Sequence, residues 1–354
     1  MVEVRTLTDG GQTAAEIARE IAAFLQGATT SLELALYDLK LGHESGQIVV
    51  PALLELERKG IAVRIVFNKD YPGGVPVPPP PQAEWYSIDQ IPVPTRAVPG
   101  VPDLMHHKYV IRDRASVLTG STNWTDDSWT REENLIVTVD SPELAERYLT
   151  DFEQLWTRRD VEKSGKVDSS PISVGGTLVR PWFTPRYGTA LAHRIASRIG
   201  AAQQRVRVAS PVITSAPILG TLAQVAADGK VDLAGVVDAT QVHQVLYQWH
   251  ENGNASWKIP ALRFLLEHGH ITGKASTPYG PGTVHDYMHA KVTVADDTVF
   301  IGSFNLSHSG ETNAENVLEI EDAALATRMA AFIDEIRGKY PPVRLAPEAG
   351  TVSP

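Results

Sequence analysis

Cysteine is absent from the 354-residue chain, which excludes disulfides, thiolate catalysis and cysteine-ligated metals. Positive charge is scarce: 32 lysines and arginines stand against 42 aspartates and glutamates, a formal net charge of −10. That balance excludes a histone-like protein that binds polyanions over its whole surface, but not a local basic groove. No apolar run approaches the roughly 20 residues of a membrane helix. The N-terminus also lacks a basic start followed by an apolar run. We therefore expect no stable membrane insertion and a cytoplasmic protein, with a secreted mature form as the alternative.

An internal repeat dominates what is present. The segments Met105–Val137 and Met288–Ile320 both read H-x-K-x4-D, then G-S-x-N, then E-N before an apolar tail. The distance from His106 to Glu133 is 27 residues and that from His289 to Glu315 is 26. The one-residue difference falls between the Asp and the Gly of the motif, where a turn can absorb it. One such match would be weak, but two at matched offsets predict a duplicated functional unit.

The flanking segments repeat as well. Glu16–Leu39 resembles Leu191–Ile213, and Leu53–Phe67 resembles Leu222–Val237; each pair reads as helix and strand. Alternation of helices and strands predicts an α/β protein of two pseudo-symmetric halves, each a mixed sheet flanked by helices. We expect the first half at 1–160, a polar linker at 161–176, the second half at 177–345 and a tail at 346–354. A proline-rich segment, 71–82, is expected to form an extended loop over the first half.

The paired H-x-K-x4-D motifs resemble those of the phospholipase D superfamily, the HKD phosphodiesterases, over nearly the whole chain. The resemblance implies that the two halves pack about a pseudo-twofold axis and share one active site at their interface, so that a monomer suffices. It also implies phosphodiester cleavage through a phosphohistidine, with no cofactor and no metal. This chemistry is coherent, because two histidines and two lysines supply a nucleophile, an acid and positive charge for an anionic transition state.

The resemblance further implies a role for each motif residue. His106 is the nucleophile and His289 the general acid, although the pseudo-symmetry leaves the opposite assignment open. Glu133 and Glu315 are the carboxylates that accept the other ring N–H of each histidine. The residues expected to hold or support the phosphate are Lys108, Lys291, Asn123, Asn305, Ser121 and Ser303. Asp113 and Asp296 complete the motifs, but they lie a strand length from the histidines and are expected to be turn or supporting anchors.

Other polar and aromatic residues have both a structural and a functional interpretation. Trp124, Trp182 and Phe304 are candidates for the wall of the substrate cleft, with core packing as the alternative. His107 is expected to pack or face solvent, because adjacent strand residues face opposite sides. Further residues for which the structural interpretation is favoured are His268, His270, His285, Asp286, Arg180 and Arg186.

The superfamily includes nucleases, phospholipases and phosphatidyl transferases, and the motifs alone do not choose among them. The local sequences around the motifs, GSTNWT followed by EEN and GSFNLS followed by AEN, resemble those of the small bacterial HKD endonucleases. We therefore expect a nuclease-type phosphodiesterase on DNA or RNA, with nucleic acid favoured over phospholipid as partner. The first alternative is a phospholipase D or phosphatidyl transferase. The second is a non-catalytic binding protein, which the intact motifs disfavour.

Overall fold

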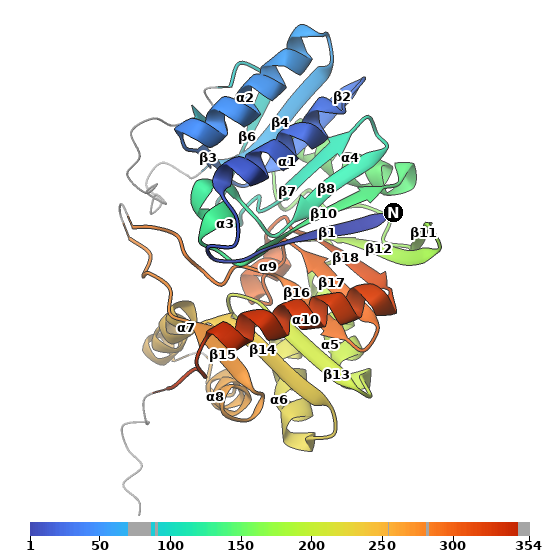
Figure 1. Ribbon diagram of the computed structural model, residues 1–354. Helices are drawn as coiled ribbons and strands as arrows, with labels where there is room; N and C mark the ends of the chain where they lie inside the picture. Colours follow the sequence, from blue (N-terminus) through green and yellow to red (C-terminus); the bar gives the residue numbers. More distant parts are fainter. Residues whose placement is uncertain (70–85, 89–90, 254, 281–282, 346–354) are drawn as a thin grey trace, which may run out of the picture.

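The computed structural model describes residues 1–69, 86–88, 91–253, 255–280 and 283–345 (Figure 1). The chain forms two halves, one above the other in Figure 1. The first half contains β1 (Val2–Leu7), α1 (Ala14–Gln26), β2 (Ser31–Leu36), β3 (Leu39–Leu41), α2 (His43–Arg58), β4 (Ala62–Lys69), β5 (Tyr86–Ser87), β6 (Thr95–Pro99), β7 (Lys108–Arg112), β8 (Ser116–Gly120), β9 (Trp124–Thr125), α3 (Asp126–Thr130), β10 (Asn134–Asp140) and α4 (Pro142–Arg158).

Among the described residues, the second half follows a similar order, with two additional helices, an additional edge strand and no counterpart of the small sheet β5-β3-β9. Its elements are β11 (Ile172–Val174), β12 (Thr177–Phe183), α5 (Gly188–Ala201), β13 (Arg205–Ala209), α6 (Ala216–Asp228), β14 (Asp232–Asp238), α7 (Ala239–Asn252), α8 (Lys258–His268), β15 (Ile271–Lys274), β16 (Val292–Ala295), β17 (Thr298–Gly302), α9 (His308–Thr312), β18 (Asn316–Glu321) and α10 (Ala323–Lys339).

The two main sheets share one seven-strand topology, and the second carries β11 as an additional edge strand. The first runs β1-β10-β8-β7-β2-β4-β6, and the second runs β11-β12-β18-β17-β16-β13-β14-β15. In both, the central strand pairs in parallel with the strand after the second helix and antiparallel with the motif strand. Each sheet is therefore mixed, and the predicted fold class of two pseudo-symmetric halves is confirmed.

Local sequence explains the ends of these elements. Thr13 and Glu16 form the predicted capping box at the start of α1. Gly60, at φ +81°, and Gly229, at φ +60°, take the left-handed conformation where α2 and α6 end. The one-residue difference between the motifs is absorbed as predicted: β7 and β8 pair up to Arg112 and Ser116, whereas β16 and β17 pair up to Ala295 and Thr298.

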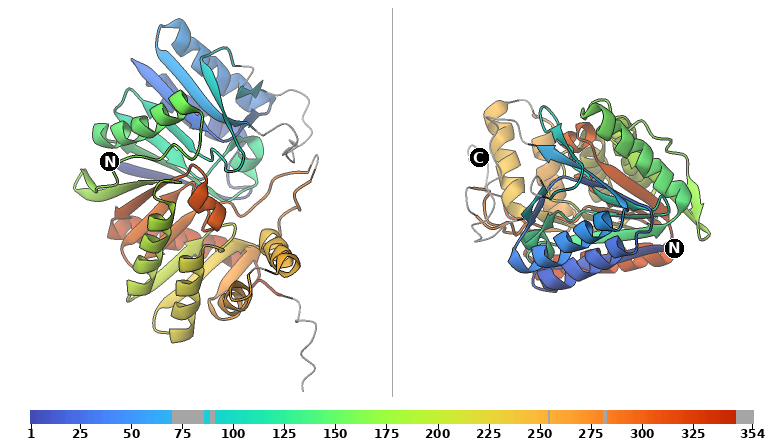
Figure 2. Two further views of the ribbon diagram at one scale, coloured as in Figure 1. Left: turned by 180° about the vertical axis from the view of Figure 1, so that it is seen from behind. Right: turned by 90° about the horizontal axis from the view of Figure 1, so that it is seen from above.

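Helices cover both sheets, and one core joins the halves. Apolar residues of α1 and α2 pack on the first sheet, and those of α5, α6, α7 and α8 pack on the second. A third cluster combines residues of both sheets with α4 and α10 (Figures 1 and 2). Within it the ring of Tyr148 lies 4.9 Å from that of Phe183, across the boundary between the halves. This shared core fixes the relative position of the two motif strands.

The segment predicted as a linker packs on the protein. Residues 161–171 run along α4, with Val161 and Val167 nearly fully buried, and the N–H of Gly165 donates to Asp151 Oδ1 at 3.0 Å. The last part of the segment forms β11, which pairs with β12. Its polar composition reflects hydrogen bonding to α4 and not a free tether. The proline-rich segment 71–82 and the tail 346–354 lie outside the described residues. Among those that are described, no helix is long and apolar enough to cross a membrane.

Candidate active site

The two histidines of the motifs meet at the boundary between the halves. His106 lies two residues before β7 and His289 three residues before β16. The residue before each histidine is held by the other half: Met105 pairs with Ala314, and Met288 pairs with Glu133. His106 is 6% and His289 9% exposed. Both line a cavity of about 180 Å³ whose walls come from both halves. The structure thus brings the two motifs together at one site.

A polar side chain at the end of a parallel strand fixes the backbone before each histidine. Asn68 Oδ1, at the end of β4, accepts the N–H of Met105 at 3.0 Å. Asp238 Oδ2, at the end of β14, accepts the N–H of Met288 at 3.0 Å. These contacts position the backbone from which both histidine rings project.

The two lysines are buried beside the histidines. Lys108 Nζ donates to the carbonyl of His106 at 2.7 Å, and Lys291 Nζ donates to the carbonyl of His289 at 2.6 Å. Burial lowers the pKa of Lys108 to about 7, although Glu315 opposes that shift. Burial and the charge of Lys108 also lower the pKa of Lys291. An anion such as phosphate beside these two lysines would favour their charged forms and so raise both pKa values.

His106 has a carboxylate partner from the other half. Its Nδ1 donates to Glu315 Oε2 at 2.8 Å, so Nε2 is the free ring nitrogen. Burial lowers the pKa of His106 to about 4, with Glu315 opposing and Lys108 assisting. Burial alone would raise the pKa of Glu315, but His106 and Lys108 bring it below its usual value. The ring of Tyr37 packs edge-on to His106 at 4.7 Å. His106 is thus a neutral, oriented imidazole opposite an ionised carboxylate.

His289 has a different partner. Its Nδ1 donates to the amide oxygen of Asn134 at 3.1 Å, and the carboxylate of Glu132 lies 3.4 Å away. Glu132 accepts hydrogen bonds from Ser128 Oγ at 2.6 Å and from Asn134 Nδ2 at 2.9 Å. Burial raises the pKa of Glu132 to about 7. Burial, Lys291 and Lys108 lower the pKa of His289.

Glu133 does not orient a histidine, contrary to the prediction. Its carboxylate accepts from Lys274 Nζ at 3.2 Å and from the hydroxyl of Tyr340. Lys274 also donates to the carbonyl of Arg131 at 2.6 Å and lies 3.0 Å from Asp9. Glu133 therefore ties the two halves together behind the site.

A one-residue register difference explains why Glu133 and Glu315 are not equivalent. Ser121 bonds both backbone groups of Leu135, whereas Ser303 bonds those of Asn316. Four residues, 131–134, separate the end of α3 from Leu135, whereas three residues, 313–315, separate the end of α9 from Asn316. In space, the counterpart of Glu315 is Asn134. The motif spacing does not reveal this register difference, because spacing is a number of residues along the chain and register depends on which residues pair between strands.

The asparagines and serines of the motifs occupy different layers. Asn123 and Asn305 line the cavity, and the Oδ1 atom of each is buried without a hydrogen-bond partner. Both serines are completely buried: Ser121 Oγ donates to Asn134 Oδ1 at 2.7 Å, and Ser303 Oγ accepts the N–H of Asn316 at 3.0 Å. The asparagines are thus placed to contact a phosphate, whereas the serines support the strands behind it.

Asp113 and Asp296 act away from the cavity, as turn anchors. Asp113 accepts the N–H groups of Thr29, Thr30 and Ser31. Asp296 accepts those of residues 203–205 in the same way. Partial burial opposes ionisation of Asp113, but the three N–H groups lower its pKa to about 2. Both aspartates have positive φ, 54° and 49°, so each closes the tight turn after its motif strand.

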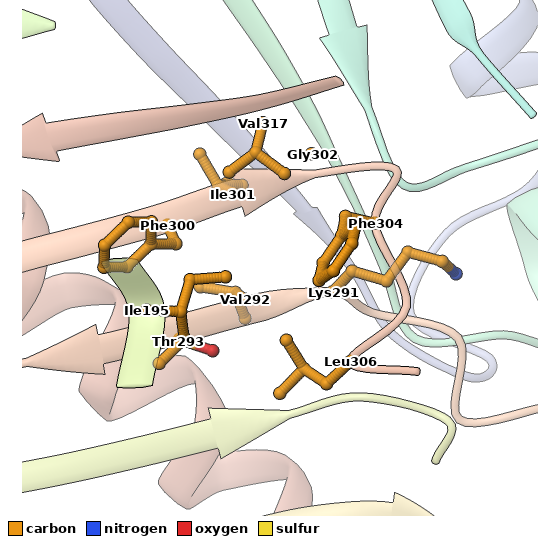
Figure 3. Close-up of a pocket in the computed structure, with 10 residues that line it drawn as sticks. All are labelled: Ile195, Lys291, Val292, Thr293, Phe300, Ile301, Gly302, Phe304, Leu306 and Val317. Carbon is orange, nitrogen blue, oxygen red and sulfur yellow. The ribbon is translucent and has the colours of Figure 1, made fainter. Parts of the chain in front are cut away.

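The three aromatic candidates for the cleft wall belong to the core. Trp124 is 1%, Trp182 7% and Phe304 2% exposed, and none lines the cavity. Trp182 Nε1 donates to Glu319 Oε2 at 3.1 Å. Phe304 lies against the alkyl part of Lys291 in a small apolar pocket, while Nζ points away from that pocket (Figure 3). Their proximity to the motifs along the chain serves packing beneath the site.

Seven residues outside the motifs complete the described cavity wall: Tyr37, Asp38, Pro211, Gln241, Tyr279, His285 and Tyr287. The ring of His285 stacks on that of Tyr287 at 5.4 Å, and the N–H of His285 donates to Asp127 at 3.1 Å. His285 therefore lines the cleft, which is the alternative to the structural role favoured from the sequence. Tyr37 and Asp38 are not predicted from the sequence motifs. The signal that could have found them is their position directly after the apolar strand β2, because ligand sites lie at the carboxyl ends of such strands.

The remaining candidates are structural. His107 is fully buried, with Nδ1 3.2 Å from Asn316 Oδ1 and Nε2 3.0 Å from Asp151 Oδ2. Arg180 lies 3.6 Å from Glu319, and Arg186 is exposed beside Tyr187. Within the described ranges, no three histidine, aspartate or glutamate side chains gather as a candidate metal site.

Comparison with known proteins agrees with this geometry. The family model described as cardiolipin synthase, PLD-like domain, matches residues 21–156 and 195–337. The chain therefore belongs to this phospholipase D-like family, and the predicted superfamily is confirmed.

Individual relatives match only parts of the chain. It is 32% identical to mitochondrial cardiolipin hydrolase of Xenopus laevis over 137 residues, which are 38% of this chain and 59% of that protein. It is 24% identical to a phospholipase D of Rickettsia typhi over 140 residues, 40% of this chain and 61% of that protein. The chain thus spans less than two thirds of the length of these relatives.

One solved structure matches nearly end to end. Phosphatidylserine synthase of Haemophilus influenzae Rd KW20 superposes with a TM-score of 0.64 at 14% identity, covering 95% of this chain and 86% of that one. At that identity the likeness shows the fold alone.

Proposed function

We propose that the protein is a phosphodiesterase that cleaves the phosphodiester of a phospholipid through a phosphohistidine at His106. The observation that carries this proposal is the pair of buried histidines, each with Nδ1 engaged, that line one cavity together with two asparagines. A buried lysine donates to the backbone carbonyl of each histidine. Nδ1 of each ring is occupied, so Nε2 is available for chemistry in both.

The proposed reaction has two steps. Nε2 of His106 attacks phosphorus, the bond to the leaving oxygen breaks, and that oxygen takes the proton from Nε2 of His289. Water or an alcohol then attacks the phosphorus, gives its proton to His289, and breaks the bond between phosphorus and His106. His106 suits the role of nucleophile because Glu315, 2.8 Å away, stabilises the positive charge that a phosphorylated imidazole carries.

Substrate binding sets the protonation states. In the empty site, Lys291, Lys108 and His106 all lower the pKa of His289 in addition to burial. A phosphodiester anion between the lysines offsets this repulsion, so the pKa of His289 rises when substrate binds. Glu132, 3.4 Å from Nδ1, stabilises the resulting imidazolium. The acid is thus charged only when there is a leaving group to protonate.

The cavity wall favours a phospholipid over a polynucleotide. Beyond the two motifs, the described wall consists of aromatic, acidic and uncharged side chains and contains no lysine or arginine. A polynucleotide needs cations along several phosphates, and the chain has a net charge of −10. A single phosphodiester with a polar alcohol on one side fits this wall better. Similarity to a family and a relative named for cardiolipin chemistry supports the same direction. The nuclease interpretation becomes the alternative outcome of the test.

The test is a parallel turnover assay in the presence of EDTA. Purified protein and its His106→Ala variant are given cardiolipin and phosphatidylcholine in mixed micelles and, separately, single-stranded DNA, duplex DNA and RNA. We expect phospholipid cleavage that the variant lacks, with nucleic acids left intact. Nucleic-acid cleavage that the variant lacks would establish the nuclease instead. Lipid cleavage that survives in the variant would refute the role of His106.

A further inference from the structure

Exposed aromatic side chains of the described residues are concentrated in one stretch of the second half. The large hydrophobic side chains that are at least 36% exposed include four aromatic ones: Tyr247 at 65%, Trp257 at 50%, Tyr279 at 41% and Phe264 at 36%. All four lie within 33 consecutive residues of the chain. Exposed aromatic side chains that are grouped, and not scattered singly, mark a surface that contacts another molecule or a membrane.

Helix periodicity places two of them on one stripe. Trp257 caps the N-terminus of α8 and Phe264 follows seven residues later, so both project from the same side of the helix. The buried face of α8 is made by Leu262, Leu265 and Leu266. On α7 the buried positions are Ala239, Val242 and Leu246, which leaves Tyr247 on the outer side. The residues that pack α7 and α8 against the protein are thus different from the exposed aromatic residues, which are not part of those buried faces.

The stretch is continuous with the active-site cavity. Tyr279 is both exposed and part of the cavity wall. Gln241, in the first turn of α7, also lines the cavity and is half-buried. Asp238, which caps α7, also accepts the N–H of the residue before His289. Figures 1 and 2 show α7, α8 and the segment between β15 and β16 on the same side of the second half. A surface that the aromatic residues contact would therefore lie beside the cavity.

Charge distinguishes the kind of surface that fits. Over residues 239–268, two basic residues, Lys258 and Arg263, balance two acidic ones, Glu251 and Glu267. Lys258 Nζ is itself engaged with the carbonyl of Thr214 at 2.9 Å. Attraction to a polyanion is therefore absent from this face, whereas tryptophan and tyrosine with balanced charge are typical of contact with the lipid–water boundary.

We propose that the aromatic residues Tyr247, Trp257, Phe264 and Tyr279 form a docking surface for a phospholipid membrane, which presents lipid headgroups to the cavity. This inference rests on the proposed function, because a lipid substrate is what docking would deliver. Binding depends on aromatic insertion at the boundary and not on charge, so it persists at high salt.

The experiment is sedimentation with phosphatidylcholine vesicles, using the full chain. We expect the Trp257→Ala/Phe264→Ala variant to bind vesicles about tenfold or more weakly than the parent, because it loses two rings that would be buried in the membrane. Leu178→Ala is the matched control: it removes an apolar side chain that is 47% exposed, on β12 and far across the sheet from β15. It should bind like the parent. About 0.5 M sodium chloride, where screening acts beyond about 4 Å, should change neither value.

Equal binding by parent and double variant, absence of binding by the parent, or loss of binding in salt would each overturn the docking surface. Analytical ultracentrifugation covers the competing occupant: a parent dimer that the double variant abolishes, without vesicle binding, would make this face a contact between two copies. Hydrolysis of a short-chain phosphatidylcholine below its micelle threshold separates the two proposals. The double variant should match the parent there while losing rate on vesicles. If the parent cleaves no phospholipid yet docks as described, only the proposed function fails.

Discussion

The carboxylate of Glu132 gives the sharpest prediction about the reaction, because its neighbour provides a matched control. Glu132 lies 3.4 Å from Nδ1 of His289, whereas Glu133 contacts Lys274 and Tyr340. Glu132→Gln and Glu133→Gln are isosteric changes of adjacent residues, and each removes one negative charge. Only the first removes a charge that faces the general acid.

The magnitude follows from the distance. With Glu132 and His289 both ionised, the pair 3.4 Å apart is worth about 5 kcal/mol at an effective dielectric of about 20. The pKa of Glu132 is about 7 in the empty site, so ionising its carboxyl at neutral pH offsets part of this energy. Asn134 continues to accept the Nδ1 hydrogen bond in the variant, so only part of that stabilisation is lost. We expect about 2–3 kcal/mol, or about 30- to 200-fold in kcat, for an alkyl leaving group. Loss of the carboxylate also lowers the pKa of His289, so the alkaline limb of the pH profile moves to lower pH.

The assay compares two leaving groups. A phosphodiester with a nitrophenolate leaving group needs little help from an acid, so Glu132→Gln should cost much less there than with an alkyl alcohol. Glu133→Gln should stay within about threefold of the parent on both substrates, with a stability loss of about 1–3 kcal/mol from the weakened contact with Lys274. An equal loss on both leaving groups in Glu132→Gln would refute its action on the acid. A larger loss of kcat in Glu133→Gln than in Glu132→Gln would refute the register difference itself.

Three further outcomes are expected. Asp113→Asn should lower the free energy of unfolding by about 1–2 kcal/mol at pH 7, allowing for solvent screening. The pKa of Asp113 is about 2 in the fold and about 3.9 unfolded, so the difference should vanish as chemical denaturation is followed down from pH 4 to pH 2. Sulfate should compete with substrate more weakly as pH rises through 7, because Lys108 has a pKa of about 7 in the empty site and the anion binds its charged form; calorimetry in two buffers should show proton uptake. His107→Gln should reduce thermal stability, because the buried ring lies 3.2 Å from Asn316 Oδ1 and 3.0 Å from Asp151 Oδ2, while leaving kcat of the folded protein within about threefold. A loss comparable with that of His106→Ala would place His107 in the site.

Much of the architecture follows from the repeat. The two copies of the motif predict the duplicated sheet, and the matched flanking segments predict its helices. Even the one-residue difference between Asp and Gly is absorbed in the turn that the pattern indicates. Such features depend on local periodicity and turn chemistry, which a single sequence displays directly.

Two features could not be predicted from the sequence: the pairing register of the strands and the burial of individual side chains. The spacing between Ser121 and Glu133 equals that between Ser303 and Glu315, yet the strands pair one residue apart, so Asn134 replaces a carboxylate beside His289. Pairing register is set by tertiary packing, and spacing alone does not encode it. Tertiary packing also determines the position of the aromatic residues beside the motifs. Phe304, for example, packs against Lys291 in the core.

The cavity wall itself comes from distant segments. Tyr37 and Asp38 follow the central strand of one sheet, and His285 and Tyr287 precede the motif strand of the other. No motif joins these positions, because the shared active site exists only once the halves pack against each other.

The central claim is a shared site in which His106 is phosphorylated and His289 supplies the proton. The most direct measurement is rapid-quench trapping of a ³²P-labelled phosphodiester with a nitrophenolate leaving group, followed by peptide mapping. In His289→Ala, attack on the activated ester proceeds while hydrolysis of the intermediate lacks its base, so acid-labile label should accumulate on the peptide that contains His106. His106→Ala should carry no label. Label on the peptide of His289 in the His106→Ala variant, or cleavage in the parent without any covalent label in either variant, would contradict the mechanism.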